Sequence, residues 1–245
     1  MASYETFARV YDSIMDQALY DAWLDFSLRH FPAGKKKVLE LACGTGILSS
    51  MLAQKGFEVT GLDLSQDMLR LAEKRASVAG QSIDFLAGNM LDLSQVGTYD
   101  MVTCYSDSIC YMEDEIDVGQ VFSEVYQALN PGGRFLFDVH STYQMDEVFP
   151  GYSYHENAED FAFVWDSYAD APPHSIVHEL TFFVQEEDGR FQRYDEVHEE
   201  RTYELITYEV LLEQAGFTNV QIFADFEDKA PSEKSARWFF VAEKA

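Results

Sequence analysis

Cysteine and basic residues are scarce in this chain, and long apolar runs are absent. Three cysteines among 245 residues are too few for a disulfide framework, and no two of them form a C-x-x-C pair. No apolar run approaches the length of a membrane span, and the N-terminal stretch, interrupted by acidic side chains, lacks the apolar core of a signal peptide. These absences predict a cytoplasmic protein without disulfide bonds or membrane spans.

The shortage of basic residues argues against two classes of partner. The chain has 17 Lys and Arg against 43 Asp and Glu, a formal net charge of −26, and Arg134 is the only basic residue between Ala76 and Gly189. Binding a nucleic-acid backbone or an anionic membrane requires clustered Lys and Arg. We therefore expect neither a nucleic acid nor a membrane as partner, and the acidic excess favours solubility.

The chain does contain a regular alternation of short apolar strands and amphipathic helices. Strands are predicted at residues 38–41, 57–62, 83–86, 101–105 and 134–139, and helical spacing fills the intervals after the first, second and fourth. Such alternation predicts a parallel sheet covered by helices on both faces. Ligands of these sheets bind at the carboxyl ends of the strands, near the point where the strand order reverses.

After the fifth strand the sequence pattern changes to one typical of antiparallel strands. Residues 161–168, 176–185 and 191–203 alternate in polarity without intervening helices, and Asp188-Gly189 is a hairpin signal between the last two. A helix at 205–215 and strands at 220–226 and 237–242 then return to the first pattern. The three segments therefore indicate an antiparallel meander inserted into the parallel domain.

One motif carries the chemistry. Residues 40–46, E-L-A-C-G-T-G, lie where the first strand turns into a helix, and Asp63 ends the second strand. Glycines at this turn allow close approach of a ligand, and an acid at Asp63 can accept hydrogen bonds from both hydroxyls of a ribose. Glu40 would repel a pyrophosphate but suits an ammonium or sulfonium group. The motif predicts a nucleoside attached to a cationic amino acid.

The segments V-L-E-L-A-C-G-T-G (38–46) and V-T-G-L-D-L-S (59–65) resemble the class I S-adenosylmethionine-dependent methyltransferases. The resemblance covers residues 36–140 and the last 40, and Asn130-Pro131-Gly132-Gly133 is a further family mark. It implies a doubly wound, Rossmann-like α/β fold with a mostly parallel seven-stranded sheet, an antiparallel β-meander insertion after strand five, and S-adenosylmethionine as cofactor.

The resemblance also implies which residues bind the cofactor. The Gly loop would hold the methionine end of the cofactor, and the acid after strand two would hold the ribose. The residue pair after strand three would hold the adenine, and the segment after strand four would lie under the methyl group. Ala42 and Asn89 depart from the usual Gly and Asp of the family. The expected cofactor-binding residues are Glu40, Ala42, Gly44, Gly46, Asp63, Leu64, Met68, Asn89, Met90 and Tyr105.

A narrower resemblance concerns the remaining segments. The helix pattern F-A-x-x-Y-D at residues 7–12 and the meander are similar to amino-sugar N-methyltransferases and to small bacterial relatives of unassigned substrate, whose D-S-L-N-Y signature resembles residues 107–111. In the sugar enzymes these segments close over the substrate. This implies an N-terminal helical lid (1–34), a cofactor-binding core (35–141 and 205–245) and a β insertion acting as substrate lid (142–204).

The expected function is methyl transfer to a small-molecule acceptor, with an amine favoured because an acidic protein attracts cations. Tyr11 and His198 are the expected catalytic residues. No metal site is predicted, because His174 and His178 lie in a turn and a strand without a third ligand at suitable spacing. A methyltransferase acting on protein or RNA, and a non-catalytic nucleoside-binding protein of the same fold, stay open as alternatives. So does assembly as a homodimer.

Overall fold

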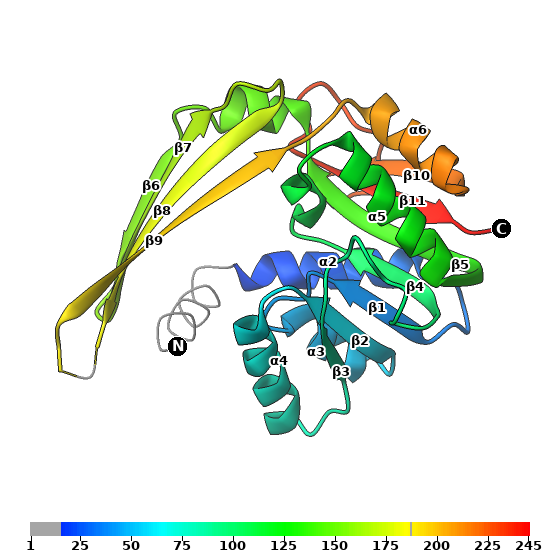
Figure 1. The fold of residues 1–245 in the computed structure, drawn as a ribbon, viewed down its shortest axis with the longest axis horizontal. Coiled ribbons are helices and arrows are strands. Elements are labelled where there is room, and N and C mark those ends of the chain that lie inside the picture. Colours follow the sequence, from blue (N-terminus) through cyan, green and yellow to red (C-terminus); the bar gives the residue numbers. More distant parts are fainter. Residues whose placement is uncertain (1–15, 187) are drawn as a thin grey trace.

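The protein contains two β-sheets (Figure 1). The structure, a computed structural model, describes residues 16–186 and 188–245. The larger sheet has the strand order β10-β11-β5-β4-β1-β2-β3. Its strands are β1 (Lys37–Leu41), β2 (Glu58–Asp63), β3 (Asp84–Ala87), β4 (Tyr99–Cys104), β5 (Leu129–His140), β10 (Thr218–Ala224) and β11 (Arg237–Glu243). Only β11 runs antiparallel to its two neighbours, so the predicted seven-stranded, mostly parallel sheet is confirmed.

Helices cover both faces of this sheet (Figure 1). Phe239 and Val241 of β11 pack on the face that carries α2 and α3, whereas Phe240 between them faces α5 and α6, because successive strand residues point to opposite faces. This burial on both faces explains the short, nearly unbroken apolar runs in the sequence. The helices are α2 (Gln17–His30), α3 (Ile47–Gln54), α4 (Gln66–Val78), α5 (Glu115–Ala128) and α6 (Leu205–Ala215), with short helices η1 (Ser108–Tyr111) and η2 (Gln144–Val148).

The inserted sheet is antiparallel and has the order β6-β7-β8-β9. It comprises β6 (Ser153–Asn157), β7 (Phe161–Ala169), β8 (Ser175–Gln185) and β9 (Phe191–Arg201). The meander is confirmed, but the sequence did not predict β6. Its side chains are almost all exposed, so it carries no hydrophobic alternation. The sheet leaves the core after β5 and returns before α6, and its apolar cluster contacts Met68 of α4.

Helix α2 is fixed to the core through Trp23. The indole is 1% exposed, lies 6.2 Å from the ring of Tyr105 in a stacked arrangement, and donates from Nε1 to Asp138 Oδ2 at 2.8 Å. Phe26, one turn later, is fully buried against Phe239 of β11. The described part of the expected N-terminal lid therefore packs on the sheet, and residues 1–15 lie outside the described residues.

Replacing Trp23 with Phe should lower the free energy of unfolding by about 1–3 kcal/mol, because Asp138 loses a donor inside the core. Urea unfolding followed by circular dichroism measures this change. Leu28→Ala, on the exposed side of the same helix, is the control and should change stability by less than about 0.5 kcal/mol. Equal stability of Trp23→Phe and the parent protein would contradict the anchoring role.

Candidate functional site

The Gly loop (residues 42–46) joins the carboxyl end of β1 to the start of α3. Ala42, Gly44 and Gly46 have φ angles of 51°, 53° and 71°, so the loop winds through left-handed conformations. The Cys43 N–H donates to the Leu62 carbonyl at 3.1 Å, which ties the loop to β2. The loop therefore lies beside the switch in strand order, where β1 has β4 on one side and β2 on the other.

The two glycines of the loop have different reasons to be glycine. A Cβ on Gly46 would lie 2.8 Å from Ala72 Cβ and 3.1 Å from the Phe85 ring, so packing of α4 and β3 excludes a side chain there. A Cβ on Gly44 would meet nothing within 4 Å. Gly44 thus leaves space for a ligand, whereas Gly46 is required by the protein interior, a distinction that the sequence motif alone does not reveal.

Asp63 ends β2 and faces the Gly loop. Its Oδ2 accepts the Gly44 N–H at 2.8 Å, and its Oδ1 accepts the Ser65 N–H at 2.8 Å. Burial raises the pKa of this carboxyl, against the opposing effect of the backbone N–H groups of Ser65, Gly44 and Leu64. Each oxygen has a second lone pair, so the carboxylate can still accept hydrogen bonds from a diol. Asp63 and Gly44 therefore form a polar cradle of the kind a ribose fits.

Glu40 lies beneath the same loop. The side chain is buried and accepts a hydrogen bond from the Ser49 hydroxyl of α3. Burial is the main reason why the pKa of Glu40 rises from 4.5 to about 8. A carboxyl held in this way can become ionised when a cation is brought next to it, because the opposite charge lowers its pKa again.

The raised pKa of Glu40 makes stability depend on pH. The folded protein keeps the Glu40 proton, whereas the unfolded chain loses it above about pH 4.5. The contribution of this proton to the free energy of unfolding is therefore complete below pH 4.5 and is lost as pH rises through about 8. Between about pH 5 and pH 8 the parent protein should lose a few kcal/mol more stability than Glu40→Gln, at about 1.4 kcal/mol per pKa unit. Urea unfolding at both pH values tests this, with exposed Glu58→Gln as the control. The same pH dependence in Glu40→Gln would contradict the assignment.

The predicted residues after β2 and β3 lie near the loop but differ in exposure. Leu64 is 69% exposed, and Met68 is partly buried against the inserted sheet. Asn89 is exposed, and its Oδ1 accepts the Leu91 N–H at 3.0 Å, whereas Met90 is buried in the core. Leu64 thus presents an exposed apolar side chain after β2, whereas Met90 belongs to the core after β3.

Tyr105, expected at the cofactor, has its side chain in the core. It is 5% exposed, and its hydroxyl shares a hydrogen bond of 2.8 Å with Ser27 Oγ of α2. Burial raises the pKa of this phenol. The side chain therefore joins α2 to the end of β4 instead of lining the edge beside Asp63.

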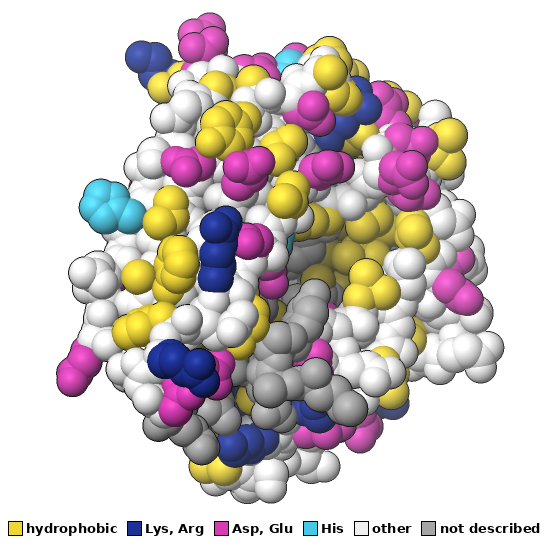
Figure 2. All heavy atoms as spheres, turned by 60° about the vertical axis from the view of Figure 1, so that its left-hand side comes forward, with side chains coloured by type: hydrophobic (Ala, Val, Ile, Leu, Met, Phe, Trp, Pro, Cys, Tyr) yellow, Lys and Arg dark blue, Asp and Glu magenta, His cyan; other side chains and the backbone are white. Residues whose placement is uncertain are grey.

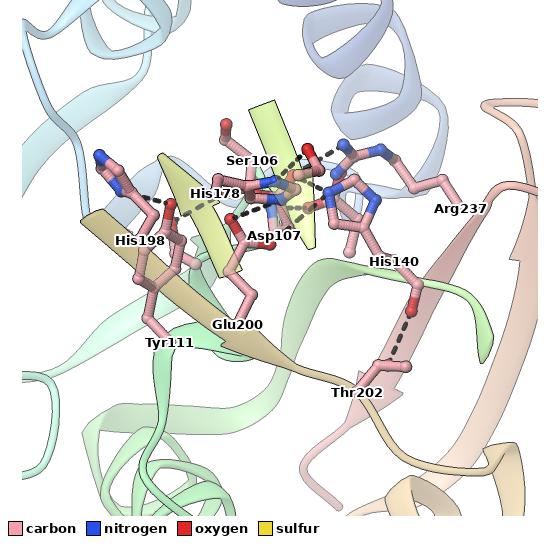
Figure 3. A network of polar contacts seen from close by, with 12 residues as sticks. Ser106, Asp107, Tyr111, His140, His178, His198, Glu200, Thr202 and Arg237 are labelled. Carbon is pink, nitrogen blue, oxygen red and sulfur yellow. Dashed lines mark hydrogen bonds and ion pairs between the residues drawn. The ribbon is translucent and has the colours of Figure 1, made fainter. Parts of the chain in front are cut away.

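His198 of β9 contacts two neighbouring side chains, and Tyr11 lies outside the described residues. The His198 Nδ1 lies 3.0 Å from the Tyr111 hydroxyl and its Nε2 lies 3.0 Å from Glu196 Oε2. Tyr111 comes from η1, after β4, so the contact joins the inserted sheet to the carboxyl edge of the core (Figure 3). His198 is therefore held at the junction between core and insertion.

Sequence reasoning missed a second group of polar residues at this edge, which we call the edge cluster: Asp107, His140, Glu200 and Arg237 (Figure 3). Asp107 Oδ1 accepts from Arg237 Nη2 at 2.7 Å and lies 3.2 Å from His140 Nε2. Burial alone would raise the pKa of Asp107, but the charges and hydrogen bonds of His140 and Arg237 hold this pKa well below its usual range. Burial raises the pKa of Glu200 to about 8. The four residues are far apart in the sequence, and only Asp107 lay in a motif.

The comparisons with known proteins agree with this geometry. Residues 38–133 match the methyltransferase domain family. A protein of Geobacillus sp. strain WCH70 with a provisional methyltransferase name is 45% identical over 246 residues, which cover 99% of this chain and all of the relative. The chain belongs to the class I S-adenosylmethionine-dependent methyltransferases. S-adenosylmethionine is therefore its cofactor, as the sequence predicted.

Two solved structures share the whole architecture of this methyltransferase. An S-adenosylmethionine-dependent methyltransferase from Clostridium acetobutylicum is 26% identical, with a TM-score of 0.84 and 98% of each chain covered. An amino pentose methyltransferase of calicheamicin biosynthesis from Micromonospora echinaspora, solved with S-adenosylmethionine bound, is 20% identical, with a TM-score of 0.76 and coverage of 98% of this chain and 96% of that one. The insertion is thus part of a shared fold.

The surface on the side of the insertion is hollowed. Figure 2 shows hydrophobic side chains inside the hollow and Asp and Glu side chains along one rim.

No helix in the described ranges is long and apolar enough to cross a membrane.

Proposed function

We propose that this methyltransferase transfers the methyl group of S-adenosylmethionine to a small-molecule amine. The observation that carries the proposal is the inserted sheet, which starts directly after β5 and whose strand β9 contacts the carboxyl edge through His198 and Tyr111. An insertion at this place confines the space next to the cofactor, which suits a small acceptor better than a folded protein or an RNA. In this proposal residues 142–204 and 1–34 form the walls of the acceptor site, and residues 35–141 and 205–245 bind the cofactor.

The cofactor-binding assignment rests on the loop geometry. We propose that Asp63 accepts the ribose hydroxyls, that the backbone at Gly44 lies against the methionine end, and that Glu40 offers its charge to the cationic end. The residues fit such a ligand, because the space above Gly44 is free and Asp63 retains acceptor capacity. Ala42, Leu64, Met68, Asn89 and Met90 complete the proposed site, and the Tyr105 side chain supports it from the core.

Asp63→Ala should weaken binding of S-adenosylhomocysteine by about 1.5–3 kcal/mol, roughly 10- to 150-fold, because hydrogen bonds to a charged group are lost. Titration calorimetry measures the affinity. The matched control is Asp84→Ala, which removes an exposed acid at the first residue of β3, away from the carboxyl ends of the strands. This variant should bind normally. Unfolding curves must show that Asp63→Ala is folded, since the Gly44 N–H also loses its acceptor. Unchanged affinity in a folded Asp63→Ala protein would exclude the ribose role.

The acceptor is proposed as an amine on electrostatic grounds. The chain carries a formal charge of −26, and a negative field raises the local concentration of cationic molecules. The bound cofactor supplies a methyl group that its sulfonium already activates, so the protein has to align the acceptor and exclude water. The amine attacks as the neutral species, and His198, 28% exposed beside Tyr111, is proposed to take its proton, with Tyr11 as a second contact. The amino pentose methyltransferase of the same fold agrees with this chemistry.

Labelled cofactor tests the proposal directly. The protein is incubated with methyl-labelled S-adenosylmethionine and an extract separated into small-molecule and macromolecular fractions. We expect label in the small-molecule fraction, in a product that keeps the methyl group on nitrogen. Label confined to protein or RNA would support the alternative methyltransferase, and cofactor binding without any transfer would support a non-catalytic nucleoside-binding protein.

A further inference from the structure

Three members of the edge cluster converge from distant parts of the chain. Asp107 follows β4, His140 ends β5 and Glu200 lies near the end of β9 (Figure 3). One ligand atom from each lies within 4.8 Å of the others. We propose that Asp107, His140 and Glu200 bind one divalent transition-metal ion of the manganese class. This site is independent of the acceptor's identity.

The distances between donor atoms suit a shared ion. Asp107 Oδ1 lies 3.2 Å from His140 Nε2, and His140 Nε2 lies 3.8 Å from Glu200 Oε2. Metal bonds of about 2.0–2.2 Å to nitrogen and oxygen place neighbouring ligand atoms about 3.0–3.6 Å apart in tetrahedral or octahedral geometry. All three ligand atoms lie within 4.8 Å of one another, so the Glu200 carboxylate would move toward Asp107 and His140 to close the site around an ion.

An unpaired buried atom points independently to a ligand. Glu200 Oε2 has no hydrogen-bond partner among the described residues, and its side chain is 4% exposed. Burying such an oxygen without a partner is costly, and native structures rarely leave one unsatisfied. Since Oε2 faces the His140 nitrogen at a distance too long for a hydrogen bond, an ion between them would satisfy both atoms.

The charges around the cluster favour a divalent ion. Three carboxyl groups gather here, because Arg237 donates to Asp138 and Asp107, and Glu200 lies 3.8 Å from the imidazoles of His140 and His178. Two negative charges would remain when all three are ionised, which one divalent ion balances. Arg237 Nη2 donates to Asp107 Oδ1, the same oxygen that faces His140, and a hydrogen-bond donor of this kind can orient a metal ligand.

The ligand set selects the class of ion. One imidazole with two carboxylates is too nitrogen-rich for the all-oxygen sites of calcium or magnesium, and it contains no thiolate. Mn²⁺ is the probe of choice, because it takes oxygen and imidazole ligands and is seen by electron paramagnetic resonance. It also binds weakly to thiols, so the three free cysteines do not compete.

The full chain, treated with chelator and dialysed, is titrated with MnCl₂ while free Mn²⁺ is followed by electron paramagnetic resonance. We expect one site per chain, with at least tenfold weaker binding in Glu200→Gln and His140→Gln. ¹⁵N-histidine labelling should change the spectrum of bound Mn²⁺ in the parent protein. The control is His174→Gln, because His174 pairs with Asp146 at 2.7 Å in an exposed His–Asp contact outside the cluster.

Three results would overturn the metal site: no bound Mn²⁺ in the parent protein, equal binding by Glu200→Gln and the parent, or weakened binding in His174→Gln. Glu200→Gln is nearly isosteric and serves if His140→Gln fails to fold, as judged by circular dichroism. Because the titration needs neither cofactor nor acceptor, its outcome is distinguishable from failure of the proposed methyl transfer.

Discussion

The buried carboxylate of Asp138 is the interaction on which the functional edge of the sheet depends. It lies in β5, is fully buried, and accepts hydrogen bonds from the Trp23 indole, the Asp107 backbone N–H and the Arg237 guanidinium. These donors come from α2, the segment after β4 and β11. One side chain thus holds four elements in register at the place where the core meets the insertion. Charge-assisted hydrogen bonds of this kind are strong because water is excluded.

Two further acidic side chains hold neighbouring elements together by hydrogen bonds at the carboxyl edge of the sheet. Asp63 fixes the Gly loop through backbone donors, and Glu40 supports the loop from below through Ser49. Arg237 is the one guanidinium that the edge cluster holds. The edge therefore combines rigid hydrogen bonding with a deficit of positive charge, which matches a cofactor that carries a sulfonium and an amino group.

The fold was predictable because its central strands are buried on both faces and glycines lie at or just after the ends of α3, α4 and α6. The apolar runs at β1, β4 and β11 follow directly from contact with helices above and below. Strand β6 escaped prediction because an exposed edge strand needs no apolar face. The Gly loop and Asp63 were recognisable as local motifs. The distinction between Gly44 and Gly46 was not, since it depends on Ala72 and Phe85 from other elements.

Residues brought together by topology were the hardest to foresee. Asp107, His140 and Glu200 meet only because β5 ends beside β4 and β9 returns to the same edge. Tyr105 follows β4, and its side chain turns toward Ser27 because α2 offers both a hydroxyl partner and an aromatic surface. Such choices are made by tertiary packing, so a single sequence does not display them.

The way the insertion enters and leaves the core has a consequence for the history of the fold. The Thr202 hydroxyl donates to the His140 carbonyl at 2.7 Å, so the chain leaves the core for the insertion close to where it returns. A segment whose ends meet can be gained, lost or exchanged without moving the elements that flank it, as in other tolerated domain insertions. The inserted sheet can therefore evolve at a different rate from the parallel core.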